Sequence, residues 1–151
     1  MRLKLFFRAA GMAHTLGRPP GGRGVPGKGE VVNTLLLVAL VFEALAAFAF
    51  IAVPGPALAP LGVALDPSGT SMARLFGAAV LGLVVLLWHA WSSADGALKR
   101  VTVRTLVAYW LASAVLMAMA LLGGLMNALG WALVVVHVVL AIWSGAFLSQ
   151  A

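Results

Sequence analysis

Four ionisable side chains lie inside long apolar stretches of the sequence, namely Glu43, Arg74, His89 and His137. A charged group in the middle of a membrane span costs about 3 kcal/mol when it faces lipid, so each of the four needs a partner or a purpose. These residues therefore indicate either polar packing between helices or a site that handles protons or a polar substrate.

Helical geometry places two of these groups at one depth. Glu43 lies ten residues from the expected outer end of its helix, and His137 lies ten residues from Asn127, which is about 15 Å in each case. Arg74 starts nearer the outer surface, and its long side chain can extend inward or outward. Ser113 lies on the apolar helix that precedes the helix of His137. Together these residues predict an internal polar seam, which we define as a row of polar contacts between Glu43, Arg74, Ser113 and His137 inside the bundle.

Small side chains share the helix faces that carry Glu43 and His137. Because small residues allow close approach of helices, these faces are expected to point into a bundle. The favoured interpretation of the seam is a buried contact that sets packing and register. The alternative is a proton- or substrate-handling site.

His89 is expected close to the opposite membrane interface, about 25 Å from the outer end of its helix. The offset of about 10 Å between His89 and His137 argues against a haem held by two histidines. Trp88, Trp91 and Trp131 are expected to anchor the chain at the interfaces, where aromatic residues gather.

Tyr109 and Trp110 lie somewhat deeper in the third apolar stretch. As for the other aromatic residues, anchoring of the span is favoured over a ligand cage.

No recognisable catalytic or cofactor motif is present. The chain has no cysteine, which removes disulfides and thiolate metal sites. It also has no HExxH pattern, no phosphate loop between a strand and a helix, and no Ser, His and Asp set on exposed loops. We expect no metal and no cofactor, and an enzyme is the less favoured class.

The composition indicates the elements that must position these residues. Of 151 residues, 63% are apolar and 9% are charged, with a mean hydropathy of +1.08. So few charged side chains cannot coat a soluble domain, and the apolar residues form long blocks, which is typical of an integral membrane protein. The net charge of +6 follows membrane topology here, so no nucleic-acid partner is expected.

The apolar blocks predict an all-α, up-down-up-down bundle of four transmembrane helices. The first block is too long for the core of a cleaved signal peptide, so it is expected to be an anchor. Residues 1–30 are basic and rich in Gly and Pro, which predicts a disordered cytoplasmic tail. The transmembrane domain is expected over 31–149, with spans at about 33–53, 72–92, 102–122 and 127–148.

The distribution of basic residues predicts the orientation. The tail and the second loop hold nine of the ten Lys and Arg residues, and Arg74 is the tenth. The positive-inside rule then places both termini in the cytoplasm. The Ala, Leu, Val and Gly-rich composition is typical of a bacterial protein.

Two segments carry a resemblance to known proteins. GVALDPSGTSMARLFGAAVLGLVVLLWHAW at 62–91 and GGLMNALGWALVVVHVVLAI at 123–142 resemble parts of small four-helix bacterial membrane proteins of unknown function, of the DoxX-like and DUF4345-like groups. The likeness extends over roughly 31–148. It implies an inner-membrane location and draws attention to Glu43 and Arg74, but it implies no catalytic residue.

Two functional classes follow. The leading hypothesis is a non-enzymatic accessory or interaction protein that works in the lipid bilayer, as a homo-oligomer or with a membrane partner protein. The alternative is a proton-coupled transporter or permease for small molecules that uses Glu43 and His137. Small multidrug transporters also have a glutamate in the first of four spans, but their surrounding motif is absent here, so that likeness is a physical analogy.

Overall fold

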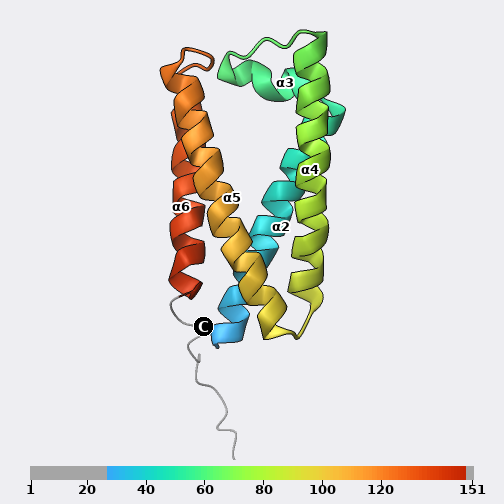
Figure 1. Cartoon of the computed structure of the whole chain (residues 1–151), viewed down its shortest axis with the longest axis vertical. Coiled ribbons are helices and arrows are strands. Elements are labelled where there is room, and N and C mark those ends of the chain that lie inside the picture. Colours follow the sequence, from blue (N-terminus) through green and yellow to red (C-terminus); the bar gives the residue numbers. More distant parts are fainter. Residues whose placement is uncertain (1–26, 149–151) are drawn as a thin grey trace, which may run out of the picture.

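The computed structural model describes residues 27–148 (Figure 1). All regular elements within this range are helices, which confirms the all-α prediction. Residues 1–26 of the predicted tail lie outside the described residues, as do residues 149–151.

Four long helices form the bundle. They are α2 (Lys28–Ala52), α4 (Pro67–Ser92), α5 (Gly96–Leu122) and α6 (Gly130–Leu148). Each is long and apolar enough to cross a membrane. They alternate in direction, so the start of α2, the α4–α5 turn and the end of α6 lie at one end of the bundle (Figure 1). We call this the terminal end and the opposite one the far end.

Capping makes three helices begin earlier than the predicted spans. Glu30 accepts a hydrogen bond from the Gly27 amide, so residues 28–30, predicted as part of the tail, form the first turn of α2. Asp66 and Asp95 cap α4 and α5 by accepting from the amides of Gly69 and Ala97, at 2.6 and 2.7 Å. Hydropathy detects only the apolar part of a helix, whereas the capping residues determine at which residue the helical conformation begins.

The first connection is itself helical. It contains α3 (Pro54–Leu58) and the 3-10 turn η1 (Ala59–Leu61), which lie across the far end in Figure 1. Pro54 suits the first position of a helix, because an amide hydrogen at that position would have no acceptor within the helix and its absence therefore costs no hydrogen bond. Gly62 ends η1 with φ +79°, a left-handed conformation that glycine adopts without strain.

The helices associate as two pairs. α2 packs along α4, and α5 packs along α6. The main apolar core lies in the half of the bundle nearer the terminal end, where all four helices contribute buried side chains: Leu35, Leu36, Ala39, Leu40, Leu87, Ala90, Val103, Leu106, Trp110, Leu140 and Ala141.

Polar contacts tie the two pairs together at both ends. At the terminal end, Lys99 of α5 donates to the Asn33 side-chain oxygen of α2 at 2.7 Å. At the far end, the Asn127 side chain donates to the Pro60 carbonyl at 2.9 Å, and its backbone amide donates to the Leu61 carbonyl at 2.8 Å. The short α5–α6 turn is thereby joined to η1.

We expect Asn127→Ala to lower the free energy of unfolding by about 1 kcal/mol, because the Pro60 carbonyl loses its donor. Asn127→Asp retains an oxygen that accepts from the Leu129 amide but has no donor for the Pro60 carbonyl, so it should destabilise the protein at least as much. Unfolding of the protein in mixed micelles, followed by tryptophan fluorescence, measures the change. Ser68→Ala, at the exposed start of α4, is the control. An equal effect of Ser68→Ala and Asn127→Ala would contradict the expectation.

Candidate functional site

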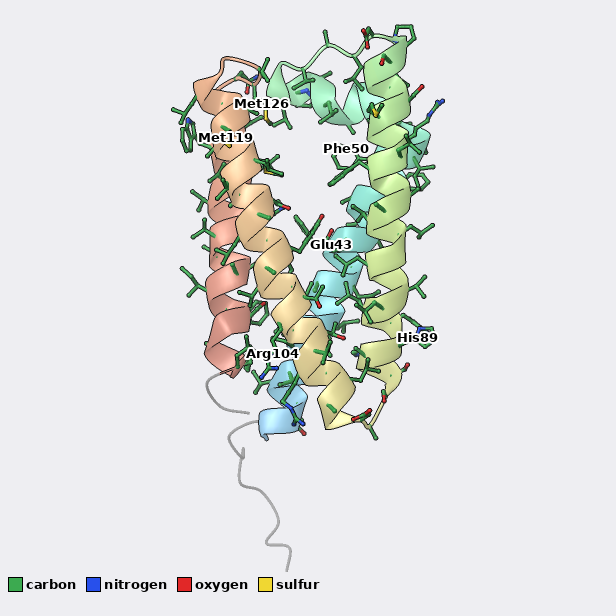
Figure 2. All side chains as sticks on the ribbon, in the orientation of Figure 1. Glu43, Phe50, His89, Arg104, Met119 and Met126 are labelled. Carbon is green, nitrogen blue, oxygen red and sulfur yellow. The ribbon has the colours of Figure 1, made fainter. Side chains whose placement is uncertain are left out.

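Glu43 is the centre of the candidate site. It lies about midway along the bundle on α2 (Figure 2) and is only 1% exposed. Trp110 donates its indole N–H to one carboxylate oxygen at 2.9 Å, and the Tyr109 hydroxyl donates to the other at 3.2 Å. Both donors lie on α5. The carboxylate therefore joins α2 of one helix pair to α5 of the other.

These two donors were not predicted as partners of Glu43. Tyr109 and Trp110 were expected to act as anchors, yet Trp110 is fully buried. The residue types could have indicated this contact, because a tryptophan N–H or tyrosine O–H deep in an apolar span needs a hydrogen-bond acceptor. In the part of the chain that the structure describes, Glu43 is the one acid within a long apolar stretch.

Ser113 lies one turn beyond Tyr109 on α5 and is half-buried. Its side chain interacts with the Tyr109 hydroxyl. The predicted association of Ser113 with Glu43 is therefore indirect and passes through Tyr109. The polar contacts run from Glu43 to Tyr109 and on to Ser113.

His137 lies at the edge of the same cluster. It is buried on α6, and its ring contacts Phe42 edge-on with ring centroids 5.9 Å apart. Its Nδ1 is 2.8 Å from the Leu133 carbonyl. A carbonyl only accepts, so Nδ1 carries the hydrogen, and in the neutral ring Nε2 is then the nitrogen able to take up a proton. His137 and Glu43 interact electrostatically.

Arg74 does not join the seam, so that part of the prediction is wrong. Its side chain is exposed on α4 and has no hydrogen bond or ion pair with any described residue. The reason is the rotation of α4, which turns Gly77, Val80 and Leu87 toward the bundle and so points Arg74 away from it.

The remaining aromatic and histidine positions lie away from Glu43. His89 is exposed near the terminal end of α4 and points outward (Figure 2), with Nδ1 2.8 Å from the Val85 carbonyl. Trp88 and Trp91 pack against each other with ring centroids 5.6 Å apart. Trp131 is at the start of α6, at the far end.

The polar contact around Glu43 is made entirely by side chains of the same chain. Within residues 27–148, every side-chain nitrogen or oxygen atom that is itself fully shielded from solvent has a hydrogen-bond partner. In the same range, no group of three His, Asp or Glu side chains is placed to hold a metal ion. Both oxygens of Glu43 are engaged by donors from the same chain, so the arrangement stabilises one packing of α2 on α5.

Comparison with known proteins adds no assignment. No protein-family model, no curated protein and no solved structure matches the chain.

Proposed function

We propose that the chain is a non-enzymatic accessory protein of the membrane, which acts by binding another membrane protein. The observation that carries this proposal is the engagement of both Glu43 oxygens by Trp110 and Tyr109 of the same chain. A carboxylate held in this way is suited to joining helices. A catalytic or transport group instead needs access to a substrate.

The positions of the basic side chains support a particular orientation of the chain in the membrane. Lys99, Arg100 and Arg104 lie in the first turns of α5, at the terminal end. The positive-inside rule supports a cytoplasmic position for this end and for both chain termini, with the inner membrane of a bacterium as the proposed location. Likeness to the DoxX-like group is part of the same proposal.

Native electrophoresis of gently solubilised membranes tests the accessory function. We expect the full chain to migrate in a discrete complex that contains a second membrane protein, identified by mass spectrometry. A chain found solely as a monomer or homo-oligomer, across detergents that preserve known complexes of the same membrane, would contradict the proposal.

His137 favours a second candidate, proton-coupled transport. Its Nδ1 bond to the Leu133 carbonyl leaves Nε2 free, and the ring interacts electrostatically with Glu43. A histidine and a glutamate at one depth form a pair between which a proton can be exchanged. In this alternative, the Glu43 contact would open and close during transport.

Proteoliposomes that enclose a pH-sensitive dye distinguish the two candidates. The vesicles are given a pH gradient and then small organic cations, anions or neutral solutes in turn. The accessory function predicts no solute-dependent proton flux above that of empty vesicles. Transport predicts such a flux, with its loss in Glu43→Gln and in His137→Asn. Ser144→Ala, a buried polar change elsewhere on α6, controls for general effects of substitution.

A further inference from the structure

The chain connects the two helix pairs at one end only. At the far end, α2 continues into α4 through α3 and η1, and α5 continues into α6 through the turn 123–129. Each of these connections stays within one pair. The α2–α4 pair is joined to the α5–α6 pair by the turn 93–95, at the terminal end. Within the described chain, the far ends of the two pairs are therefore held together by non-covalent contacts alone.

Packing between the pairs is concentrated in the half of the bundle nearer the terminal end, where the apolar core shared by all four helices lies. In Figure 1, α2 and α5 cross near the middle of the bundle and then diverge toward the far end. The buried apolar residues beyond Glu43, in the far half, do not belong to the shared core: Ala47, Leu61, Val80 and Ala114. The two pairs are thus interlocked in one half of the bundle and diverge in the other.

The tightest contacts of the far half lie inside each pair. An added Cβ at Gly77 of α4 would lie 2.8 Å from the Cγ1 of Ile51 on α2. At Gly130 of α6, an added Cβ would lie 2.9 Å from the Cδ2 of Leu121 on α5. Because such small residues allow two helices to pack closely, each pair is expected to keep its own packing when the pairs move relative to each other.

Asn127 supplies the hydrogen bonds between the pairs at the far end. Its side chain donates to the Pro60 carbonyl at 2.9 Å, and its backbone amide donates to the Leu61 carbonyl at 2.8 Å. The same side chain lies against Gly62, where an added Cβ would be 3.3 Å from its Nδ2. We call this contact of Asn127 with residues 60–62 the far-end latch. Among residues 27–148, no other hydrogen bond joins the two pairs beyond the level of Glu43.

The far-end latch is easier to break than the shared core. Asn127 and Pro60 are exposed, so water can replace either partner of their hydrogen bond. The core instead contains Leu35, Leu36 and Trp110, which have no exposed surface. Segments with few buried contacts and exposed hydrogen bonds open at a lower free-energy cost than a packed core. Release of the latch is therefore expected before any loosening of the terminal half.

We propose that the far-end latch controls an opening movement, in which the α2–α4 and α5–α6 pairs separate at the far end while the terminal half stays packed. The turn 93–95 and the shared core act as the hinge. Ala47 and Ala114 are buried one helical turn beyond Glu43 and Trp110, so separation at their level exposes the Glu43 contact from the far side. This movement goes beyond the accessory function and rests on neither candidate function.

Distances between spin labels, measured on the full chain in lipid nanodiscs, test the movement. The labels are attached to p-acetylphenylalanine, which leaves cysteine available for a disulfide in a chain that has none of its own. Labels at Met72 and Leu122 report the separation of the two pairs at the far end. Labels at Ser92 and Ile142 report on the terminal half, and labels at Phe48 and Met72 report within the α2–α4 pair. All five positions are exposed.

In the native sequence we expect one main far-end distance and a minor, longer one. Asn127→Ala should raise the population of the longer distance by about five-fold relative to the main one, as for the loss of one hydrogen bond of ordinary strength. Ser68→Ala, at the exposed start of α4, should leave the distribution unchanged. The terminal-half and within-pair distances should be the same in all three proteins.

A disulfide across the latch provides the converse test. An ideal Cβ at Gly62 lies 3.4 Å from the Asn127 Cβ, close to the separation of about 3.8 Å found across disulfides. In the double variant Gly62→Cys and Asn127→Cys, the oxidised protein should lose the longer far-end distance. Reduction of the same protein should bring it back to at least the level seen in Asn127→Ala, because cysteine does not replace the amide donor.

Several results would overturn the opening movement. A far-end distribution that is identical in Asn127→Ala and the native sequence would show that Asn127 holds nothing closed. An equal change in the terminal-half distance would mean that the whole bundle loosens, and an equal change within the α2–α4 pair would mean that the pairs are not units. Should Asn127→Ala fail to fold, identical distributions in the oxidised and reduced double variant would overturn the proposal equally.

Discussion

Replacement of Glu43 with alanine is expected to lower the free energy of unfolding by about 2–4 kcal/mol, because one buried and one half-buried donor lose their acceptor at once. The indole N–H of Trp110 and the hydroxyl of Tyr109 both bind this carboxylate. With no water in the hydrocarbon region, the Trp110 indole cannot find a substitute acceptor without rearrangement, whereas the Tyr109 hydroxyl still has the Ser113 side chain beside it. Unfolding in mixed micelles measures the change, with tryptophan fluorescence as the signal.

Two further variants determine whether the lost hydrogen bonds cause this effect. Glu43→Gln keeps an oxygen that can accept from one of the two donors, so we expect about half the loss. Tyr109→Phe added to Glu43→Ala removes one unsatisfied donor. The double variant should therefore be more stable than Glu43→Ala alone. If Tyr109→Phe destabilised the protein equally in the presence and absence of Glu43, the contact would not be the source of the stability.

Gly77→Ala is expected to lower the free energy of unfolding by about 1–3 kcal/mol, because the added methyl group overpacks the α2–α4 contact. Its carbon would lie 2.9 Å from the Phe50 Cβ and 3.0 Å from the backbone nitrogen of Ile51. Backbone atoms cannot move aside as the end of a flexible side chain can, so the two helices must separate. The same unfolding measurement records the loss.

Gly82→Ala is the matched control, five residues further along the same helix. Alanine is the better helix former by about 1 kcal/mol, and its methyl group meets no neighbour within 4 Å. We expect unchanged or slightly higher stability of the isolated protein. Equal destabilisation by the two substitutions would show that glycine matters here through the helix backbone, and the account of close packing at Gly77 would be wrong.

Much of the architecture could be predicted because lipid imposes simple requirements. Long apolar blocks must be helices that satisfy their own backbone hydrogen bonds. The short connections after Ser92 and Leu122 then force neighbouring helices to run in opposite directions. The helix ends were harder to predict, because caps such as Asp66 and Asp95 extend the helices beyond the apolar residues that hydropathy detects.

The candidate site was predicted only in part. The depth of Glu43 follows from counting residues, and the requirement that it have partners follows from the cost of charge in a membrane. The choice of partners does not follow from depth. Arg74 was expected to approach Glu43 because its side chain is long enough, but it is exposed on α4, and donors from α5 take its place.

The deep positions of Glu43 and His137 in apolar helices follow from residue order alone, because the rise per residue converts position along the chain into depth along the helix. Residue order contains no equally direct measure of rotation about each helix axis. Rotation depends on which small residue allows which neighbour to approach, as Gly77 does for α2. The packing of the folded helices therefore had to be known before Glu43 could be assigned to Tyr109 and Trp110 and Arg74 to the face that points away from the bundle.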